Sequence, residues 1–285
     1  MSFKTLLIRT LSGIVYVALI FCAILFNEYL FAIIFGILCA LTTYEFHKLT
    51  NKQENVNALA WLGAAGSLLL FALVFFQSWS DDISCNENQI TEQLVDTLRF
   101  VFLYLYILFF IFVFVVEIIR NQSNPIHNIA YVFLSQIYIV LPFLFMTGII
   151  FKFHKIIFLA LFVLIWANDV FAYLIGSLAG RHKLIVRISP NKSWEGLFGG
   201  LVGALIAGFV FSKINMDLNL IQWLGFALVI VIFGTLGDLF ESLIKRTIGV
   251  KDSGNIMPGH GGFLDRLDSV LFAAPAAMIY LIIIA

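Results

Sequence analysis

Charged residues are scarce in this chain of 285 residues. Only 12% of them are Asp, Glu, Lys or Arg, whereas 61% are hydrophobic. A soluble globular domain has roughly 25% charged and roughly 45–50% apolar residues, so a soluble fold is excluded. Seventeen basic residues balance seventeen acidic ones, so the chain lacks the positive excess that would hold a nucleic acid. We therefore expect no nucleic-acid partner.

Cysteine is also rare, and its spacing excludes two site classes. Cys22, Cys39 and Cys85 are the three cysteines, and no Cys-x-x-Cys occurs. This pattern supports neither a disulfide framework nor a zinc site. The apolar run 11–26 is not followed by a small-x-small cleavage site, and the bulky Phe21 precedes Cys22. We expect this run to be a retained membrane span, not a secretory signal or a lipoprotein anchor.

The sequence is rich in apolar stretches that are long enough to cross a bilayer. Backbone polar groups in hydrocarbon must be satisfied internally, and continuous apolar runs favour helices over the alternating pattern of a β-barrel. The sequence therefore predicts an all-α, polytopic integral membrane helix bundle with about nine transmembrane helices. The predicted spans are 11–26, 29–44, 57–77, 100–119, 128–150, 156–178, 195–212, 219–237 and 268–285.

The basic residues predict an orientation. Thirteen of the seventeen Lys and Arg fall in the loops on the N-terminal side of the predicted bundle, which the positive-inside rule places in the cytoplasm. We expect an integral protein of a plasma membrane or bacterial inner membrane, with a cytoplasmic N-terminus. We divide the chain into N-terminal transmembrane helices, 1–160, with little chemical signal, and a C-terminal catalytic transmembrane region, 161–285.

Polar residues are concentrated in one segment of the second region. An ionised side chain at mid-bilayer costs about 2.5–3.5 kcal/mol on the insertion scale, so a group of them needs water, a ligand, a metal or each other. The segment must therefore line a cleft or a cytoplasmic surface. Its nine charged residues within 31 positions are Asp238, Glu241, Lys245, Arg246, Lys251, Asp252, Asp265, Arg266 and Asp268.

Helical spacing groups several of these side chains. Asp238 and Ser242 are four residues apart and share a face, and Asp265 and Asp268 are three apart. Glu241 and Lys245 are interpreted as a supporting i,i+4 pair on the same helix. Asp238 differs because it stands at the end of an apolar span, where an unpaired carboxylate would be costly.

A glycine-rich loop lies between the two helical segments. Five glycines and Pro258 occur between 249 and 262, and glycine allows the backbone to approach a phosphate closely. Carboxylates without a matching Cys or His set indicate a hard cation such as Mg²⁺, and neighbouring Lys and Arg would bind phosphate oxygens. A salt-bridged structural cluster and an ion-conduction pathway stay open as alternatives.

Three segments of the last 120 residues carry a resemblance to a known family. These segments are Asn168-Asp169-x-x-Ala172-Tyr173-x-x-Gly176-x-x-x-Gly180, Ser189-Pro190-Asn191-Lys192-Ser193-Trp194-Glu195-Gly196, and Ser242-x-x-Lys245-Arg246 followed by Lys251-Asp252-x-Gly254 and Pro258-x-His260-Gly261-Gly262-x-x-Asp265-Arg266-x-Asp268. With them the sequence resembles the phosphatidate cytidylyltransferases, also called CDP-diacylglycerol synthases. Met257 departs slightly from the family pattern and is similar in volume and apolarity to the usual residues.

The resemblance implies a nucleotidyltransferase of phospholipid biosynthesis. The enzyme would transfer CMP from CTP to phosphatidate, giving CDP-diacylglycerol and pyrophosphate, at the cytoplasmic face. It would bind Mg²⁺ through the carboxylates of Asp238 and Asp265. CTP, phosphatidate and membrane lipid are the implied partners, and a homo-oligomer stays open.

The remaining candidate residues follow from the same segments. Asp169 is a candidate site residue or the partner of a buried cation. His260 either donates to a phosphate or holds its loop, and the basic residues either contact phosphate or only set the topology. Asp252 and Asp268 would orient Lys251 or metal-bound water. The predicted catalytic residues are Asp238, Asp265, Lys245, Arg246 and His260, and the predicted binding residues are Lys192, Lys251, Arg266, Gly261, Gly262 and Ser242.

Two further sequence patterns are interpreted as structural and not catalytic. Pro190 and Ser193 are typical of a helix start, with Ser193 as the cap and Trp194 at headgroup height. Gly176 and Gly180 have the small-x-x-x-small spacing of close helix packing.

Other functions are kept as alternatives. A related CTP-using lipid or polyprenol kinase, or another nucleotidyltransferase, would use much of the same site, although attack by an alcohol would need a base. An ion-coupled transporter would explain intramembrane carboxylates, but no inverted repeat is found. A CDP-alcohol phosphotransferase is disfavoured because its Asp-Gly-x-x-Ala-Arg element is absent.

Overall fold

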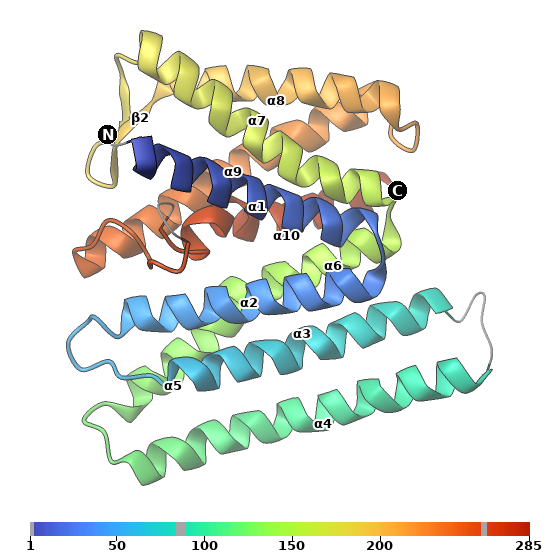
Figure 1. The fold of residues 1–285 in the computed structure, drawn as a ribbon, viewed down its shortest axis with the longest axis vertical. Coiled ribbons are helices and arrows are strands. Elements are labelled where there is room, and N and C mark those ends of the chain that lie inside the picture. Colours follow the sequence, from blue (N-terminus) through green and yellow to red (C-terminus); the bar gives the residue numbers. More distant parts are fainter. Residues whose placement is uncertain (1–2, 84–88, 258–260) are drawn as a thin grey trace. The chain divides into compact units, whose positions relative to one another are not determined.

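The computed structural model describes residues 3–83, 89–257 and 261–285 (Figure 1). Helices dominate these ranges, as predicted. They are α1 (Phe3–Leu25), α2 (Glu28–Thr50), α3 (Ala60–Ile83), α4 (Gln89–Arg120), α5 (Pro125–Ser135), the π-helical η1 (Gln136–Val140), α6 (Leu141–Lys152), α7 (Lys155–Ala179), α8 (Trp194–Ile214), α9 (Leu220–Ile248) and α10 (Leu264–Ile284).

The predicted spans correspond to these helices. Within the described ranges, eight helical segments are long and apolar enough to cross a membrane, and α5, η1 and α6 together form one of them. The first predicted span corresponds to α1, whose apolar part Thr10–Leu25 is shorter. The chain is a polytopic integral membrane protein, and the all-α prediction is confirmed. Among the described residues, a short hairpin between α7 and α8 departs from the helical pattern and is formed by β1 (Lys183–Ile185) and β2 (Ser189–Ser193), which pair antiparallel.

Sequence signals fix several helix ends. The side chain of Asn27 accepts a hydrogen bond from the amide of Leu30 (2.8 Å) and begins α2. α9 begins with a reciprocal capping box between Asn219 and Gln222. It ends at Gly249, whose φ of 79° is left-handed and therefore favours glycine.

The described chain divides into two compact units. Unit 1 consists of Met1–Phe151 and Asp252–Arg266, and unit 2 of Lys152–Lys251 and Leu267–Ala285. The division at residue 160, which was based on chemical signal, stays a prediction. The part of the glycine-rich loop from Asp252 onward and Asp265 thus belong to unit 1, whereas Gly249 and Asp238 belong to unit 2.

In unit 1, α2, α3 and α4 pack side by side (Figure 1). Aromatic side chains fill much of the interior: Phe31 stacks on Phe35, and Phe143 packs edge-on against Phe35 and Phe71. Buried aromatic pairs of this kind add attraction beyond the burial of their area. A few polar side chains, among them Glu45 and Glu117, are also buried in this unit.

In unit 2, α7 packs along α8, and α8 packs on α9. The first contact is close because Gly176 faces Gly196: a methyl group on Gly196 would lie 2.9 Å from the carbonyl oxygen of Ala172. The interpretation of Gly176 as a packing residue is therefore confirmed. Small residues allow helix backbones to approach in this way in membranes.

Candidate functional site

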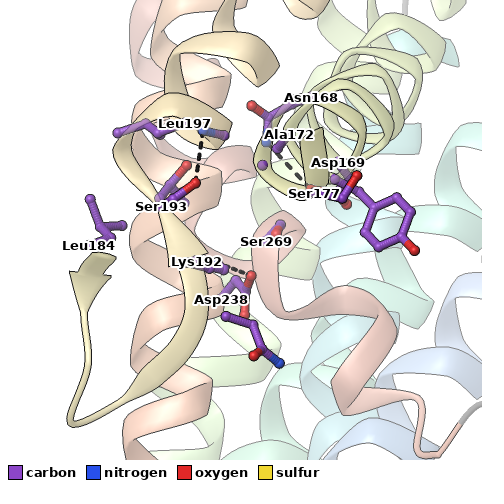
Figure 2. Close-up of a pocket in the computed structure, with 15 residues that line it drawn as sticks. Asn168, Asp169, Ala172, Ser177, Leu184, Lys192, Ser193, Leu197, Asp238 and Ser269 are labelled. Atoms are coloured by element: carbon purple, nitrogen blue, oxygen red, sulfur yellow. Dashed lines mark hydrogen bonds and ion pairs between the residues drawn. The ribbon is translucent and has the colours of Figure 1, made fainter. Parts of the chain in front are cut away.

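Unit 2 contains a cavity of about 530 Å³ with a polar wall. Its lining comes from α7, both strands, α8, α9 and the first turns of α10, and Figure 2 shows these side chains around it. The polar residues of the wall include Asn168, Asp169, Asn191, Lys192, Ser193, Thr235, Asp238 and Ser269. The fold thus brings together two of the three motif segments and Asp238.

The central contact of the cavity is an ion pair between Lys192 and Asp238. The ammonium group of Lys192, on β2, points at the carboxylate of Asp238, on α9 (Figure 2). Both side chains are about 30% exposed, so ligands and water can reach them. The hydroxyl of Ser242, one turn later on α9, donates to Asp238 Oδ1 (3.4 Å). Three predicted site residues therefore lie together.

Two further carboxylates belong to the same region of unit 2. Asp268 interacts electrostatically with Asp238, Asp169 and Lys192, and its carboxylate accepts a hydrogen bond from the amide of Ser269 (2.6 Å). Asp169 is exposed on α7 and lines the cavity, where it accepts a hydrogen bond from the Asn168 side chain (3.4 Å). Three carboxylates near one lysine leave an excess of negative charge, which favours a cation.

β2, the strand that carries Lys192, leads directly into the N-cap of α8. Ser193 is the N-cap of α8, and its hydroxyl accepts a hydrogen bond from the amide of Gly196 (3.1 Å). The prediction that Ser193 caps a helix is confirmed. Because Ser193 and Gly196 also line the cavity, this cap holds one wall of the site in place.

The hairpin that contains β1 and β2 is held at two places. The carboxylate of Glu195 accepts hydrogen bonds from the amides of Arg181 and His182 (both 3.2 Å) and pairs with the His182 ring (2.6 Å). Arg246 donates to the carbonyl oxygens of Ile188 (3.3 Å) and Val250 (3.1 Å). Arg246, predicted to contact phosphate, is thus at least partly engaged with backbone.

The other predicted basic residues differ in their surroundings. Lys245 forms an ion pair with the fully buried Glu241, which confirms the predicted i,i+4 pair. Lys251 is exposed beyond the end of α9. Arg266 is exposed in unit 1, and its carbonyl oxygen accepts a hydrogen bond from the Tyr16 hydroxyl (3.4 Å).

Asp265 organises the glycine-rich loop in unit 1. Its carboxylate accepts hydrogen bonds from the amide of Ser253 (3.0 and 3.2 Å to its two oxygens) and from the amide of Gly262 (2.9 Å). Gly261 has a φ of 85°, and a methyl group there would lie 2.6 Å from Asp265 Oδ2. Glycine is therefore required at this position. His260, Pro258 and Gly259 lie outside the described residues.

The donor set fits a hard cation. Mg²⁺ usually takes one or two protein carboxylates and keeps water or phosphate oxygens as its other ligands, and Asp238 offers a reachable carboxylate. Among the described residues, no three His, Cys, Asp or Glu side chains gather closely enough to form a complete metal site. Asp238 and Asp265 belong to different units, so their pairing around a metal stays a prediction.

Sequence reasoning missed one carboxylate beside the loop. Glu45, on α2, is 2% exposed, and its Oε2 accepts a hydrogen bond from the amide of Leu264 (3.0 Å). The signal was present, because Glu45 directly follows the apolar run that was assigned to a span, and an ionisable residue there is a functional candidate. It was overlooked because the segments recognised as similar to the family all lie in the last 120 residues.

Comparison with known proteins decides the family. The model of the Cytidylyltransferase family matches residues 7–284. The chain belongs to this family. The predicted resemblance, which rested on segments of the last 120 residues, is therefore confirmed, and the match to the family extends beyond those segments to residue 7.

Individual relatives match over a shorter stretch. A phosphatidate cytidylyltransferase of Staphylococcus saprophyticus is 50% identical over 131 residues, which cover 45% of this chain and 49% of that protein. The proteins of the same name from Staphylococcus aureus and Staphylococcus haemolyticus are 50% and 51% identical over 123 residues, 42% of this chain and 47% of theirs. The chain thus matches about half the length of these curated relatives.

Proposed function

We propose that this chain is a phosphatidate cytidylyltransferase, which transfers CMP from CTP to phosphatidate and releases pyrophosphate. Family membership and the similarity to phosphatidate cytidylyltransferases of three staphylococci support the activity. The observation that carries the proposal is the polar cavity of unit 2, in which Lys192 and Asp238 pair among apolar helices. Such charges inside a membrane helix bundle indicate a substrate or ion site.

The chemistry needs charge neutralisation more than a base. A phosphatidate oxygen attacks the α-phosphorus of CTP, and the bond from that phosphorus to the bridging oxygen of the β-phosphate breaks, so that pyrophosphate leaves. The attacking phosphate is already ionised near neutral pH, so no side chain has to remove a proton. Positioning and compensation of negative charge then provide the acceleration.

Lys192 is suited to bind a phosphate. Its side chain is partly exposed in the cavity. Its backbone directly precedes Ser193, which is fixed by its hydrogen bond with the amide of Gly196. Because it is a mobile point charge on a flexible stem, it can turn from Asp238 to an incoming phosphate oxygen. Lys251 and Arg266, both exposed, would add binding of the triphosphate, as would the amides of Gly261 and Gly262.

We further propose Mg²⁺ as the cofactor, with Asp238 and Asp265 as its protein ligands. When bound, the ion would neutralise phosphate oxygens and the developing charge of the leaving group. Asp268 and Asp169 would orient bound water and Lys192 by their charge. Asp265 would keep its carboxylate in a fixed direction through its three backbone hydrogen bonds.

The site is proposed to lie at the cytoplasmic face. The positive-inside rule supports this orientation, because most Lys and Arg fall in the loops of that side. Single cysteines in a cysteine-free background would test it. Glu54→Cys, in the loop after α2, should react from the cytoplasm, and Met216→Cys, which is 91% exposed after α8, from the other side. The reverse labelling pattern would overturn the proposed face.

A product assay tests the activity itself. Purified protein in detergent, given labelled CTP, phosphatidate and Mg²⁺, should form a CDP-lipid and pyrophosphate in equal amounts. Parallel reactions with dCTP, ATP and no nucleotide separate a transferase from a kinase, which would form CDP and a more phosphorylated lipid, and from a transporter, which would form neither. If folded protein binds CTP but forms no CDP-lipid, the proposal is refuted.

A further inference from the structure

Glu45 lies where no substrate-binding motif had been found, yet it contacts the glycine-rich loop. It lies in α2, outside every motif segment. Its Oε2 accepts a hydrogen bond from the amide of Leu264, which is 219 residues away in the sequence. The amides of Phe263 and Ile256 also interact with this carboxylate. One buried side chain of unit 1 thus binds the segment that precedes α10.

Two glycines of the loop rest directly against the same carboxylate. A methyl group on Gly254 would lie 2.6 Å from Glu45 Oε1, and one on Gly262 would lie 2.5 Å from Oε2. Real side chains do not tolerate such distances, so a methyl group at either position would displace the Glu45 carboxylate from the loop. The contact with Glu45 gives these two glycines a role besides the close approach to phosphate that the sequence suggested.

Glu45 and Asp265 hold the same strip of backbone from two sides. Gly262 leaves no room for a side chain beside Glu45 Oε2, and its amide donates to Asp265 Oδ2 (2.9 Å). Leu264, which donates to Glu45, immediately precedes Asp265 in α10. The two carboxylates also repel each other electrostatically. A change at Glu45 must therefore alter where Asp265 points.

Burying this carboxylate is costly, so a structural role alone is a poor explanation. An apolar side chain would pack against the helices without the penalty of desolvating a charge. A carboxylate is needed only if the loop amides must be held in one arrangement. We propose that Glu45 is a positioning residue, which sets the direction of the Asp265 carboxylate by binding the backbone on its N-terminal side. This inference rests on the proposed function, in which Asp265 is a metal ligand.

The test compares Glu45→Gln with a matched control, Glu117→Gln. Glu117 is also a buried carboxylate of unit 1, 7% exposed, but it bonds Arg120 and Asn128 (2.6 and 2.9 Å) on α4 and α5. Each variant is purified in detergent and measured for melting temperature, for the rise in melting temperature caused by Mg²⁺ without nucleotide, and for kcat and KM.

The proposal predicts a specific pattern. Loss of a group that supports a metal ligand typically costs about 10- to 100-fold in metal affinity or activity. Glu45→Gln should reduce kcat by about this factor and shift the Mg²⁺ response to about 10- to 100-fold higher concentration, with KM for CTP changed less than about threefold. Glu117→Gln should lower the melting temperature but leave the Mg²⁺ response unchanged.

A second variant covers the case in which Glu45→Gln does not fold. Gly254→Ala leaves every charge in place but inserts a methyl group against Oε1, and it should weaken the Mg²⁺ response in the same way. If both variants keep the wild-type Mg²⁺ response, or if Glu117→Gln weakens it equally, Glu45 is only structural and the proposal is wrong. The failure of the proposed function is seen separately, as wild-type protein that makes no CDP-lipid.

Discussion

Lys192 on β2 pairs with Asp238 on α9, although the two residues are 46 positions apart. The pair joins a residue of the second motif segment to an aspartate that lies one helical turn before the third. A carboxylate in this cavity therefore already has a cationic partner before any ligand arrives. Binding of a metal or a phosphate has to replace that contact, and this gives the first two predictions.

Asp238→Asn should lose turnover by about 10²- to 10³-fold, which is typical when a group that stabilises transition-state charge is removed. The protein should still insert and fold, because the asparagine keeps the shape of the side chain. Asp217→Asn is the matched control: it removes one carboxylate of unit 2 that lies in the loop before α9 and bonds Asn215. CDP-lipid formation by both variants is measured, and near-normal turnover of Asp238→Asn would show that it is no ligand.

Lys192→Met should also lose turnover, and it should raise KM for the phosphate substrate that the lysine binds. The double variant with Asp238→Asn distinguishes a shared role from two separate ones. Because the side chains contact each other, their effects should not add: the double variant should be less impaired than the product of the single losses. Strictly multiplicative losses in kcat/KM would argue that the pair does not act as a unit.

Removal of divalent metal should stop the reaction. With excess chelator, CDP-lipid formation should fall to background, and added Mg²⁺ should restore it, because oxygen ligands of this kind favour a hard cation. The assay uses the purified wild-type protein and quantifies pyrophosphate and lipid product together. Equal product in chelator would mean that the assignment of Asp238 and Asp265 as metal ligands is mistaken.

Gly196→Ala should destabilise unit 2 by about 1–3 kcal/mol, the usual cost of forcing extra volume into a packed contact. The added methyl would lie 2.9 Å from the carbonyl oxygen of Ala172 and push α8 from α7. Gly234→Ala is the control, because its methyl would lie 3.6 Å from Ser269 Cβ, an ordinary contact. Thermal unfolding in detergent should show a lower melting temperature only for Gly196→Ala, and equal effects would contradict the close-packing argument.

Much of the fold follows from the sequence because the membrane restricts the choices. Hydrocarbon requires internally satisfied backbone and a minimum helix length, so each apolar stretch predicts one helical segment. The cap at Ser193 was predictable for a local reason, since a serine after Pro190 and before an apolar run has the chemistry of a helix start.

The site was predicted less completely, because its contacts are long-range. Sequence spacing places Glu241 beside Lys245 on one helix, but no spacing rule relates Lys192 to Asp238 or Glu45 to Leu264. Arg246 shows the same limit: its charge suggested phosphate binding, whereas its guanidinium donates to the carbonyl oxygens of Ile188 and Val250. Tertiary neighbours, not residue type, decide what such a group binds.

The hairpin between α7 and α8 is held by several polar contacts, whereas α7 and α8 pack closely through small residues. Glu195 accepts hydrogen bonds from the amides just before β1, and Arg246 donates to a carbonyl oxygen in the turn. β2, which follows the turn, carries Lys192. Dissolved ions weaken exposed charge contacts but leave hydrophobic burial almost untouched. Added salt should therefore loosen this strand, and with it the position of Lys192 in the cavity, at concentrations that leave the packing of the surrounding helices unchanged.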